Sequence, residues 1–320
     1  MTATVSMRAA YGAALLELGK VRTDVVVLSA DVANSDFSSM FGEAFPDRFL
    51  NVGIAEPCLV DVAVGLASTG LVPFANTFAF LLATRAVEAI RTHCCYGGAP
   101  VKLMGAYAGL SDSFDGPTHH AITDIAIMRS LPGMTIVSPA DATAVTKLLP
   151  AICDWPGPVY VRLNRNEVPV LFDDGYAPEI GKAMVHRAGA DVTLVGTGIM
   201  VGRCLDAATT LAEDGIDARV LEIHTIKPLD VGAVLAAVVE TGALVTAEEH
   251  SVVGGLGGAV AEVVGSSIPV PVERVGLADT FATSGPYLEL LDHVGLSVDS
   301  IVAAALKAVA AKSRAGGRRA

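Results

Sequence analysis

The stretch MTIVSPADATAVTKLLPAICDWPGPVYVRLN, residues 134–164, decides the fold of this chain. Two short runs within it, 134–141 and 158–164, have the apolar composition of buried β-strands. An Ala-rich helical segment lies between them, and Asp141 stands where a helix N-cap is expected. Strands that alternate with helices in this way are typical of a parallel or mixed sheet wrapped by helices. The stretch therefore predicts an α/β fold.

The same alternation continues in both directions along the chain. Further runs with the composition of buried strands lie at 24–31, 100–107, 190–198, 217–225, 242–250 and 270–277. A polar, Pro-containing stretch, NEVPVLFDDGYAPEIGK (166–182), interrupts the pattern. We therefore predict two α/β domains, over 1–170 and 186–312, joined by a linker over 171–185. The basic, Gly-containing residues 313–320 are expected to form a disordered tail.

Composition limits the classes of partner and location. The chain has 320 residues, of which 52% are hydrophobic, and its net charge of −12 argues against nucleic acid or an anionic membrane as the main partner. Five cysteines without metal-binding spacing, and an N-terminus without a signal pattern, predict a cytoplasmic protein with reduced thiols. The uncharged run 62–84 is long enough to span a bilayer, but Pro73 would break a helix in its middle. We expect a buried helix, a turn and a second element there.

Two glycine-rich stretches raise a nucleotide-binding hypothesis. VGTGIMVG (195–202) follows a predicted strand and precedes a helical segment, as phosphate-binding loops do, and GGLGGAV (254–260) is a poorer match. Tight turns between strands and helices also use glycine when no ligand is bound, so we favour a structural role for both stretches.

The polar loop within SDSFDGPTHHAITDIAIMRSLPGM (111–134) is the densest candidate site. Asp115, His119 and His120 lie there just before a predicted helix, where catalytic groups often project. The two histidines lack a carboxylate or cysteine at zinc-like spacing, and the chain has no G-x-S-x-G motif. Proton handling or hydroxyl recognition is therefore favoured over a metal site or a Ser-His-Asp triad.

Glu56 is the second candidate. In RFLNVGIAEPCLVDVAVGLA (48–67) it stands in a mostly apolar stretch at a predicted helix start. A carboxylate removed from water is costly unless it is paired or its pKa rises. Glu56 is therefore either a solvated residue at a helix start or a working acid.

Five motifs give the chain a family resemblance. They are NVGIAE (51–56), DGPTHH (115–120), PGMTIVSPAD (132–141), VRLNRN (161–166) and IKPLD (226–230). Together they resemble the C-terminal half of transketolase-family enzymes, which depend on thiamine diphosphate, and most of all the smaller subunit of split transketolases. The resemblance implies a pyrimidine-binding domain with the thiamine-diphosphate-binding fold, followed by a transketolase C-terminal domain that binds no nucleotide.

The resemblance also implies cofactor-binding residues. Glu56 matches the carboxylate that hydrogen-bonds N1′ of the aminopyrimidine ring, a role that requires a dry, apolar place. Phe78 and Phe80 lie where the family stacks an aromatic side chain on that ring, and one of them can belong to the core instead. Asp31 matches an aspartate that approaches the cofactor, with capping at a strand end as its alternative role.

Substrate-binding residues follow in the same way. The positions that match sugar-phosphate ligands of transketolase are Arg8, Ser35 and Arg165, with Arg162 as a nearby competitor for Arg165. His119 is implied as a catalytic residue that hydrogen-bonds the sugar oxygens, and Asp115 as the residue that selects hydroxyl configuration.

One expected part of the family site is missing from the chain. The diphosphate-binding half of the family carries a G-D-G motif followed by Asn, and the similar FDGP of this chain belongs to the substrate loop. A metal–diphosphate group needs such a set of oxygen ligands and amides. We therefore expect no metal site in this chain. The Mg²⁺ ion and the diphosphate are expected to bind to a larger N-terminal diphosphate-binding transketolase subunit. By analogy with the family, the two subunits are expected to form an α2β2 assembly.

The predicted function is that of the pyrimidine-binding and C-terminal subunit of a two-component transketolase in carbohydrate metabolism of the pentose phosphate type. It moves a two-carbon ketol unit from a ketose phosphate to an aldose. The alternatives are a 1-deoxyxylulose-5-phosphate-synthase-like or 2-oxo acid dehydrogenase β-subunit-like enzyme, a silent scaffold, and a nucleotide-binding oxidoreductase.

Two departures from the family pattern concern the substrate. Tyr107 stands where transketolases usually have a phosphate-binding His, and Phe114 where they have Glu. Replacing a cationic donor with a phenol is expected to weaken phosphate binding or to make room for another substituent, which suggests a non-standard sugar phosphate as substrate. Arg8 and Arg165 still argue for an anionic substrate end.

Overall fold

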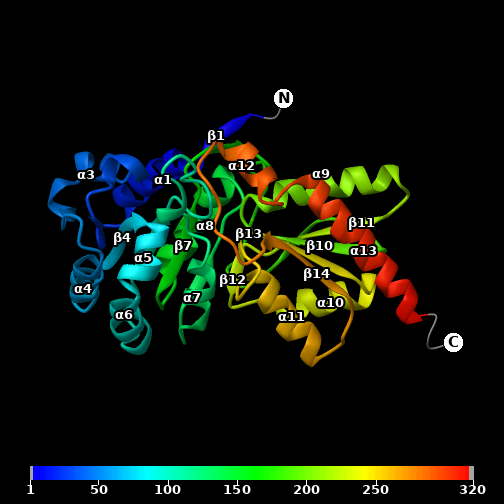
Figure 1. Cartoon of the computed structure of the whole chain (residues 1–320). Helices are drawn as coiled ribbons and strands as arrows, with labels where there is room; N and C mark the ends of the chain where they lie inside the picture. Colours follow the sequence, from blue (N-terminus) through cyan, green and yellow to red (C-terminus); the bar gives the residue numbers. More distant parts are fainter. Residues whose placement is uncertain (1–2, 317–320) are drawn as a thin grey trace.

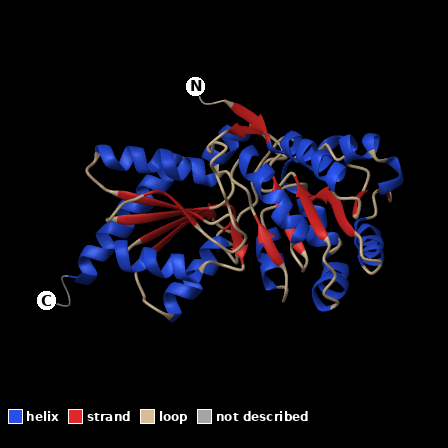
Figure 2. Cartoon of the chain, turned by 180° about the vertical axis from the view of Figure 1, so that it is seen from behind, coloured by secondary structure: helices blue, strands red, loops and turns tan. Residues whose placement is uncertain are grey.

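A computed structural model describes residues 3–316 as two α/β domains lying side by side (Figure 1). The first is built on a seven-stranded sheet and the second on a five-stranded sheet, and helices cover both sheets (Figure 2). The predicted fold class is confirmed. A two-stranded ribbon of β1 (Thr4–Ser6) and β8 (Glu167–Pro169) connects the two ends of the first domain.

The first sheet has the order β12-β6-β7-β5-β4-β2-β3. Its strands are β2 (Val25–Ser29), β3 (Phe49–Asn51), β4 (Val72–Phe78), β5 (Lys102–Ala106), β6 (Thr135–Val137), β7 (Val159–Leu163) and β12 (Thr225–Lys227). All pairs are parallel except β12 with β6. The opening stretch forms β6, a helix and β7 as predicted, and Asp141 caps that helix by accepting a hydrogen bond from the Ala144 amide at 2.7 Å.

Helices bury the two faces of this sheet. On one face α1 (Met7–Val21) packs against α8 (Ala142–Asp154). Apolar residues of these helices pack against every second residue of the strands, such as Val25 and Val27 of β2. On the other face lie α4 (Glu56–Ala67), α5 (Ala79–Arg85), α6 (Val87–Ala89) and α7 (Asp124–Ser130). The alternation of inward positions along each strand produces these two cores.

The remaining segments of the first domain are short. They are α2 (Ala33–Asp36), α3 (Ser39–Ala44), the 3₁₀ turns η1 (Pro46–Arg48) and η3 (Gly116–Thr118), and the π-helical segment η2 (Ile90–Tyr96). The uncharged run 62–84 forms the end of α4, a turn, β4 and the start of α5. The predicted helix, turn and second element are therefore confirmed for this run.

The second sheet has the order β14-β13-β10-β11-β9. Its strands are β9 (Met184–Arg187), β10 (Val192–Gly196), β11 (Ala218–Glu222), β13 (Leu244–Ser251) and β14 (Val272–Leu277), and only β9 runs antiparallel to its neighbour. One face carries α9 (Met200–Glu213) and α13 (Val298–Gly316), and the other carries α10 (Val231–Thr241) and α11 (Leu256–Ser266). A short helix, α12 (Tyr287–His293), faces the first domain through Tyr287.

Two predicted boundaries differ from the structure. Strand β9 already begins at Met184, within the stretch predicted as linker up to 185, because its residues complete the edge of the second sheet. Helix α13 continues through Gly316, so the predicted disordered tail is wrong for 313–316. The rest of that prediction, 317–320, lies outside the described residues.

The apolar stretch Tyr287–Arg314 is the one helical segment among residues 3–316 long and apolar enough to cross a membrane, and an 18-residue window within it has a mean hydropathy of 1.7. A turn over 294–297 divides it into α12 and α13. Leu291, Ile301 and Ala305 of these helices are buried in the core of the second domain. The packing favours a core role for this stretch.

A buried ion pair fixes α7 to the first sheet. Arg162 in β7 donates from Nε to Asp124 Oδ2 at 2.7 Å, and the Tyr160 hydroxyl donates to the same oxygen at 2.7 Å. Both charged side chains are almost completely buried. Arg162 is thus structural, which is the alternative role that the sequence left open for it.

Removing one partner of this pair tests its contribution. We expect Asp124→Ala to lower the free energy of unfolding by about 3–5 kcal/mol, because it leaves the Arg162 charge buried without a counterion. The matched control is Asp154→Ala, which breaks the exposed pair with Arg22 and should cost less than about 1 kcal/mol. Urea unfolding measures both values, and equal effects of the two substitutions would contradict the assignment.

Candidate active site

The predicted site residues gather at one edge of the first sheet. They follow the carboxyl ends of its parallel strands: Asp31 after β2, Glu56 after β3, Phe78 at the end of β4, Tyr107 after β5 and Arg165 after β7. Carboxyl ends of parallel strands meet at the same edge, which is where ligands bind in open α/β sheets. The topology therefore brings these residues together although they are far apart in the sequence.

Tyr107 is the centre of a cationic and aromatic cluster. Its ring stacks on Phe78 with centroids 4.5 Å apart and an interplanar angle of 15°. The guanidinium carbons of Arg8 and Arg165 lie 5.0 Å and 4.8 Å from the centre of the same ring. Tyr107 has a φ of 60°, in the left-handed region that side chains other than glycine seldom adopt. The backbone there is held in this conformation by the packing around the ring.

Arg8 reaches this cluster from the start of α1. Its Nε donates to the Arg165 carbonyl at 2.9 Å, and its Nη1 donates to the Tyr107 hydroxyl at 3.2 Å and to the carbonyl of Ser35. Burial lowers the pKa of Arg8 below its ordinary value. The structure thus joins three predicted substrate residues, Arg8, Ser35 and Arg165.

Arg165 forms ion pairs with two carboxylates of the loop between β5 and α7. Its Nη1 donates to Asp112, which is buried, and lies 3.6 Å from Asp115, which is exposed. Burial, followed by the neighbouring Asp115, raises the pKa of Asp112 to about 6. Asp115 thus lies in the cluster with Arg165. Sequence reasoning missed Asp112, because nothing in the motif marks it as an ion-pair partner.

The two adjacent histidines occupy different environments. His119 is half-buried, with its Nδ1 3.0 Å from the Thr118 hydroxyl and its ring edge-on to Phe78 at 6.3 Å between centroids. His120 is buried, and neither of its ring nitrogens has a hydrogen-bond partner among the described residues. Burial lowers the pKa of His120, so its ring is neutral at pH 7. His119 is therefore the histidine that faces the cluster.

Glu56 is the first residue of α4 and is only 2% exposed. Its one polar contact among the described residues is with Arg85 of α5, 3.5 Å from Nη1 to Oε1. Such a long contact leaves most of the hydrogen-bonding capacity of the carboxylate unused. A buried carboxylate with free acceptor capacity fits a ligand that offers a proton.

Asn51 connects Asp31 to the loop before Glu56. Its Oδ1 accepts hydrogen bonds from the Asp31 amide at 3.1 Å and the Gly53 amide at 3.0 Å, and its Nδ2 donates to Asp31 Oδ1 at 2.9 Å. Asp31 has a φ of 63° and is exposed at the strand end. Sequence reasoning missed Asn51, although its place at the end of a strand was a usable signal.

The two candidate aromatic residues differ in environment. Phe78 belongs to the Tyr107 cluster, whereas Phe80 packs against the buried core between α4, α5 and the sheet. The environment of Phe78 favours it over Phe80 as a ligand contact, in line with the alternative that one of the two belongs to the core.

The second domain holds the loop between β5 and α7 in place. Glu249 in β13 accepts a hydrogen bond from the Leu110 amide at 2.7 Å and from the Tyr287 hydroxyl at 3.0 Å, and Tyr287 accepts one from Asn164 Nδ2 at 2.5 Å. A Cβ at Gly109 would lie 2.3 Å from Glu249 Cδ, so only glycine allows this approach. Sequence reasoning missed Glu249, because no local sequence pattern indicates that a side chain will contact the other domain.

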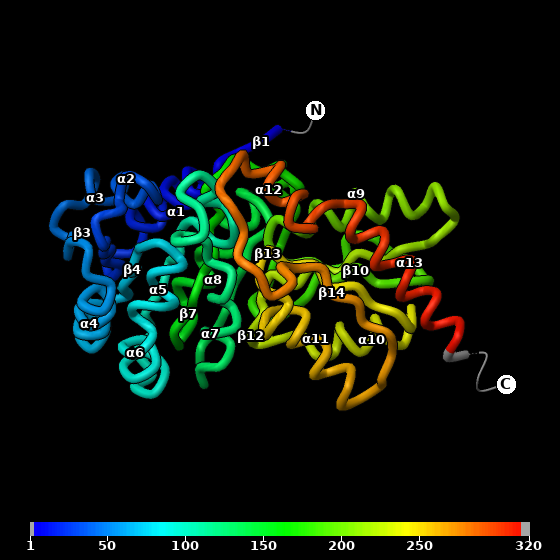
Figure 3. Tube along the Cα trace, in the orientation of Figure 1, coloured from blue at the N-terminus to red at the C-terminus, as the bar shows by residue number. Residues whose placement is uncertain are grey.

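Segment 278–286 makes a second contact with the same loop. It runs from β14 across to the first domain (Figure 3), where the Gly285 amide donates to the Ser113 carbonyl at 3.0 Å. A Cβ at Gly116 would lie 2.3 Å from Ser284 Oγ. The loop that carries Asp115 and His119 is therefore held by the second domain at its start, through Leu110, and in its middle, through Ser113 and Gly116.

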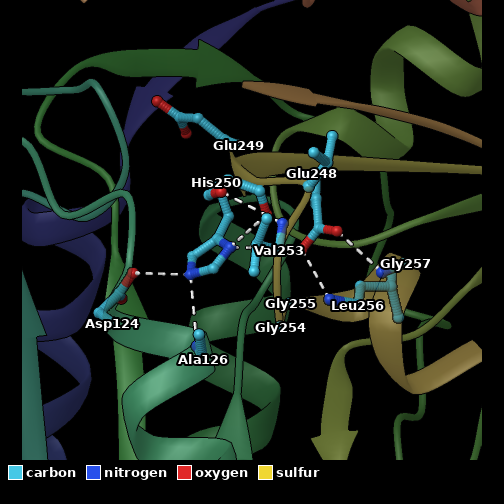
Figure 4. A network of polar contacts seen from close by, with 12 residues as sticks. Asp124, Ala126, Glu248, Glu249, His250, Val253, Gly254, Gly255, Leu256 and Gly257 are labelled. Carbon is cyan, nitrogen blue, oxygen red and sulfur yellow. Dashed lines mark hydrogen bonds and ion pairs between the residues drawn. The ribbon is translucent and has the colours of Figure 1, made fainter. Parts of the chain in front are cut away.

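The glycine-rich stretch 254–260 has a structural role in this network (Figure 4). Glu248 accepts hydrogen bonds from the amides of Leu256 at 2.6 Å and Gly257 at 2.8 Å, at the N-terminus of α11. His250 beside it accepts one from the Ala126 amide at 3.3 Å. Because a buried carboxylate already occupies this helix N-terminus, it offers no place for a phosphate.

Comparisons with known proteins agree with this geometry. Residues 3–170 match the family "Transketolase, pyrimidine binding domain", and residues 181–301 match "Transketolase, C-terminal domain". The 6-deoxy-6-sulfo-D-fructose transketolase subunit SqwH of Clostridium sp. (strain MSTE9) is 40% identical, with 93% of each chain covered. An apulose-4-phosphate transketolase subunit of Phocaeicola vulgatus is 37% identical over 95% of this chain and 98% of that protein.

A solved structure described as a split gene transketolase, inactive beta4 tetramer, is also similar. It has a TM-score of 0.90 and 44% identity, and the match covers 96% of this chain and 99% of that one. The chain therefore belongs to the transketolase family, and it corresponds to the C-terminal subunit of the split members.

The buried Glu249 predicts a pH dependence of stability. Burial raises its pKa to about 7 from an ordinary 4.5, so between these pH values the folded state binds a proton that the unfolded state has lost. Its contribution to the free energy of unfolding therefore falls as the pH rises through this window. We expect the stability of Glu249→Gln, relative to the unmodified chain, to increase between about pH 5 and pH 7.

Thermal unfolding at several pH values measures this difference. Asp36 and Asp112 also have raised pKa values, but they are present in both chains and cancel in the comparison. A difference between the two chains that does not change with pH would contradict the prediction.

Proposed function

We propose that this chain is the pyrimidine-binding and C-terminal subunit of a two-component transketolase. The observation that carries the proposal is Glu56, a carboxylate only 2% exposed whose single polar contact among the described residues is 3.5 Å long. It lies at the same sheet edge as the cluster of Arg8, Tyr107 and Arg165. The similar proteins named as subunits of transketolases support the same assignment.

The proposed reaction exchanges a carbon–carbon bond without net oxidation. The bond between C2 and C3 of a ketose donor breaks as the C3 hydroxyl loses its proton and becomes a carbonyl. C2 of the two-carbon unit then forms a new bond to the carbonyl carbon of an aldose acceptor, whose oxygen gains a proton. The donor leaves as an aldose two carbons shorter, and the acceptor becomes a ketose two carbons longer. The donor has an anionic end group, for which the sequence predicts phosphate.

Thiamine diphosphate fits one part of the site in this chain. When bound, it supplies the electron sink that allows a bond next to a carbonyl to break. Glu56 would bind the pyrimidine ring and share a proton with its nitrogen, since the buried carboxylate has free acceptor capacity. Phe78 would contact the ring as an aromatic neighbour.

The remaining residues would act on the sugar. His119 is half-buried beside Phe78 and offers a titratable ring to the sugar oxygens. Asp115, exposed at the rim of the cluster, would accept hydrogen bonds from sugar hydroxyls. Arg8 would bind the anionic end of the donor.

The metal and the diphosphate belong, in this proposal, to a partner subunit. No group of three or more His, Cys, Asp or Glu side chains suited to a metal ion occurs among residues 3–316. Ile54 and Leu50, close to Glu56 in the sequence, are 72% and 38% exposed, and such an apolar surface suits a subunit contact. The similar solved structure that contains four β chains is described as inactive, which supports the need for a partner. An α2β2 assembly is the arrangement we propose.

Replacing Glu56 tests the proposal in the enzyme reconstituted from both subunits. We expect Glu56→Gln to lower kcat for ketol transfer by about 10²–10⁴-fold, because the amide cannot exchange a proton with the cofactor ring. The matched control is Glu17→Gln on the exposed face of α1, which should leave kcat unchanged. Activity of Glu56→Gln within about threefold of the control would refute the role of Glu56.

Two further measurements separate the competing functions. Pyruvate consumption in place of ketose cleavage would favour a 1-deoxyxylulose-5-phosphate-synthase-like enzyme. Tight binding of thiamine diphosphate with Mg²⁺ by the lone chain, measured by calorimetry, would contradict the two-subunit arrangement.

A further inference from the structure

Tyr107 is more buried than the side chains around it. The resemblance implies that it replaces a substrate-binding His, yet its side chain is only 7% exposed, so little of its surface is open to a ligand. The three side chains that contact it, Phe78, Arg8 and Arg165, are each half-buried. A ligand can therefore reach the neighbours of Tyr107 much better than Tyr107 itself.

The first contact of Tyr107 is with Phe78, the aromatic residue proposed to contact the cofactor ring. The two rings are nearly parallel, with an interplanar angle of 15° and centroids 4.5 Å apart. Phe78 is the last residue of β4, and the His119 ring meets it edge-on. A stacked aromatic pair contributes more free energy than the area it buries. Tyr107 therefore restricts the orientations that the Phe78 ring can adopt.

The second contact of Tyr107 is with both arginines of the site. The guanidinium carbons of Arg8 and Arg165 lie 5.0 Å and 4.8 Å from the centre of its ring, within the range of cation–π attraction. Its hydroxyl also accepts a hydrogen bond from Arg8 Nη1 at 3.2 Å. One buried ring thus contacts the aromatic residue of the site and both of these cationic residues.

The main chain at Tyr107 is held in a costly conformation. Its φ of 60° lies in the left-handed region, which is unfavourable for residues other than glycine. The amide of the next residue, Ala108, donates to the carbonyl of Leu163, the last residue of β7, at 3.0 Å. Strain of this kind persists where the surroundings fix it, and it occurs mainly at functional sites. The strained turn supports a role in the site for the side chain that it carries.

We propose that Tyr107 is a positioning residue, whose buried ring holds Phe78 for the cofactor and the two arginines for the substrate. The inference rests on the proposed function, because it concerns the two groups that bind in that same reaction. The stacked ring accounts for the effect on the cofactor. The cation–π contacts and the hydrogen bond from Arg8 account for the effect on the substrate.

Substitutions of Tyr107 separate these contacts in the enzyme reconstituted from both subunits. Tyr107→Leu removes the ring, so we expect the Kd for thiamine diphosphate with Mg²⁺, measured by calorimetry without donor, to rise about tenfold. At saturating cofactor, kcat/KM for a ketose phosphate donor should also fall by about tenfold or more, because both arginines lose their aromatic contact. Tyr107→Met is a second variant without a ring, and the same effects are expected for it.

Tyr107→Phe keeps the ring and removes only the hydroxyl that accepts from Arg8. We expect the Kd for thiamine diphosphate to stay within about twofold of the unmodified enzyme, whereas KM for the donor should rise about fivefold. The matched control is Tyr96→Leu, since Tyr96 is 91% exposed at the end of η2, before the amino end of β5. This control should leave both the Kd and kcat/KM unchanged.

A double substitution tests whether Tyr107 acts on the cofactor through Phe78. In a chain that already carries Phe78→Leu, the stacked pair is gone, so Tyr107→Leu should raise the Kd for thiamine diphosphate no further. Far-UV circular dichroism of every variant measures whether its fold is retained.

Three results would overturn the inference and leave the transketolase assignment intact. They are an unchanged Kd in both variants without the ring, additive effects of Tyr107→Leu and Phe78→Leu on the Kd, and a loss of kcat/KM in Tyr107→Phe as large as in Tyr107→Leu. The last result would mean that the hydroxyl binds the substrate directly. Absence of thiamine diphosphate binding by the unmodified pair of subunits would overturn the proposed function, and this inference with it.

Discussion

The buried guanidinium of Arg162 is the interaction on which the arrangement of the two domains depends. It lies in the first sheet and donates to Asp124 of α7, to the Ala121 carbonyl and to the Glu249 carbonyl of the second domain, the last two at 3.1 Å. A buried charge tolerates few arrangements, because each donor left unpaired is costly. The side chain therefore fixes the sheet, the helix and the second domain relative to one another. It also holds the end of the loop between β5 and α7, through the Ala121 carbonyl.

The site combines a tightly packed frame of side chains with a few polar groups that lack full hydrogen-bond or charge partners within the described residues. Tyr107, Phe78 and the two arginines pack tightly around one another, and the second domain holds the loop that carries His119. Within this frame Glu56 keeps free acceptor capacity and Arg8 keeps its charge. Such groups are costly in a folded protein, and they persist at functional sites because a ligand completes them.

Much of this organisation could be predicted from the sequence, for identifiable reasons. The runs 134–141 and 158–164 are mostly apolar because both faces of their strands are covered by helices. These strands could therefore be predicted from the local sequence alone. Most site residues were found because they belong to short motifs at strand ends. Asp112, Glu249 and the place of β12 in the first sheet were not predictable, since each depends on a partner that is distant in the sequence. The change from the α-helix α6 to the π-helical segment η2 likewise could not be predicted from the local sequence.

Strand β12 links the two halves of the chain, so it affects how the chain could be divided into fragments. It comes from the second half of the sequence, yet it pairs with β6 and forms the outer strand of the first sheet. A fragment that stopped at the end of the first domain would expose the β6 edge, with unpaired amides and carbonyls that can recruit a strand from a neighbouring molecule. The two halves are consequently interlocked through this strand, and the edge of the first sheet is not complete without the second half of the chain.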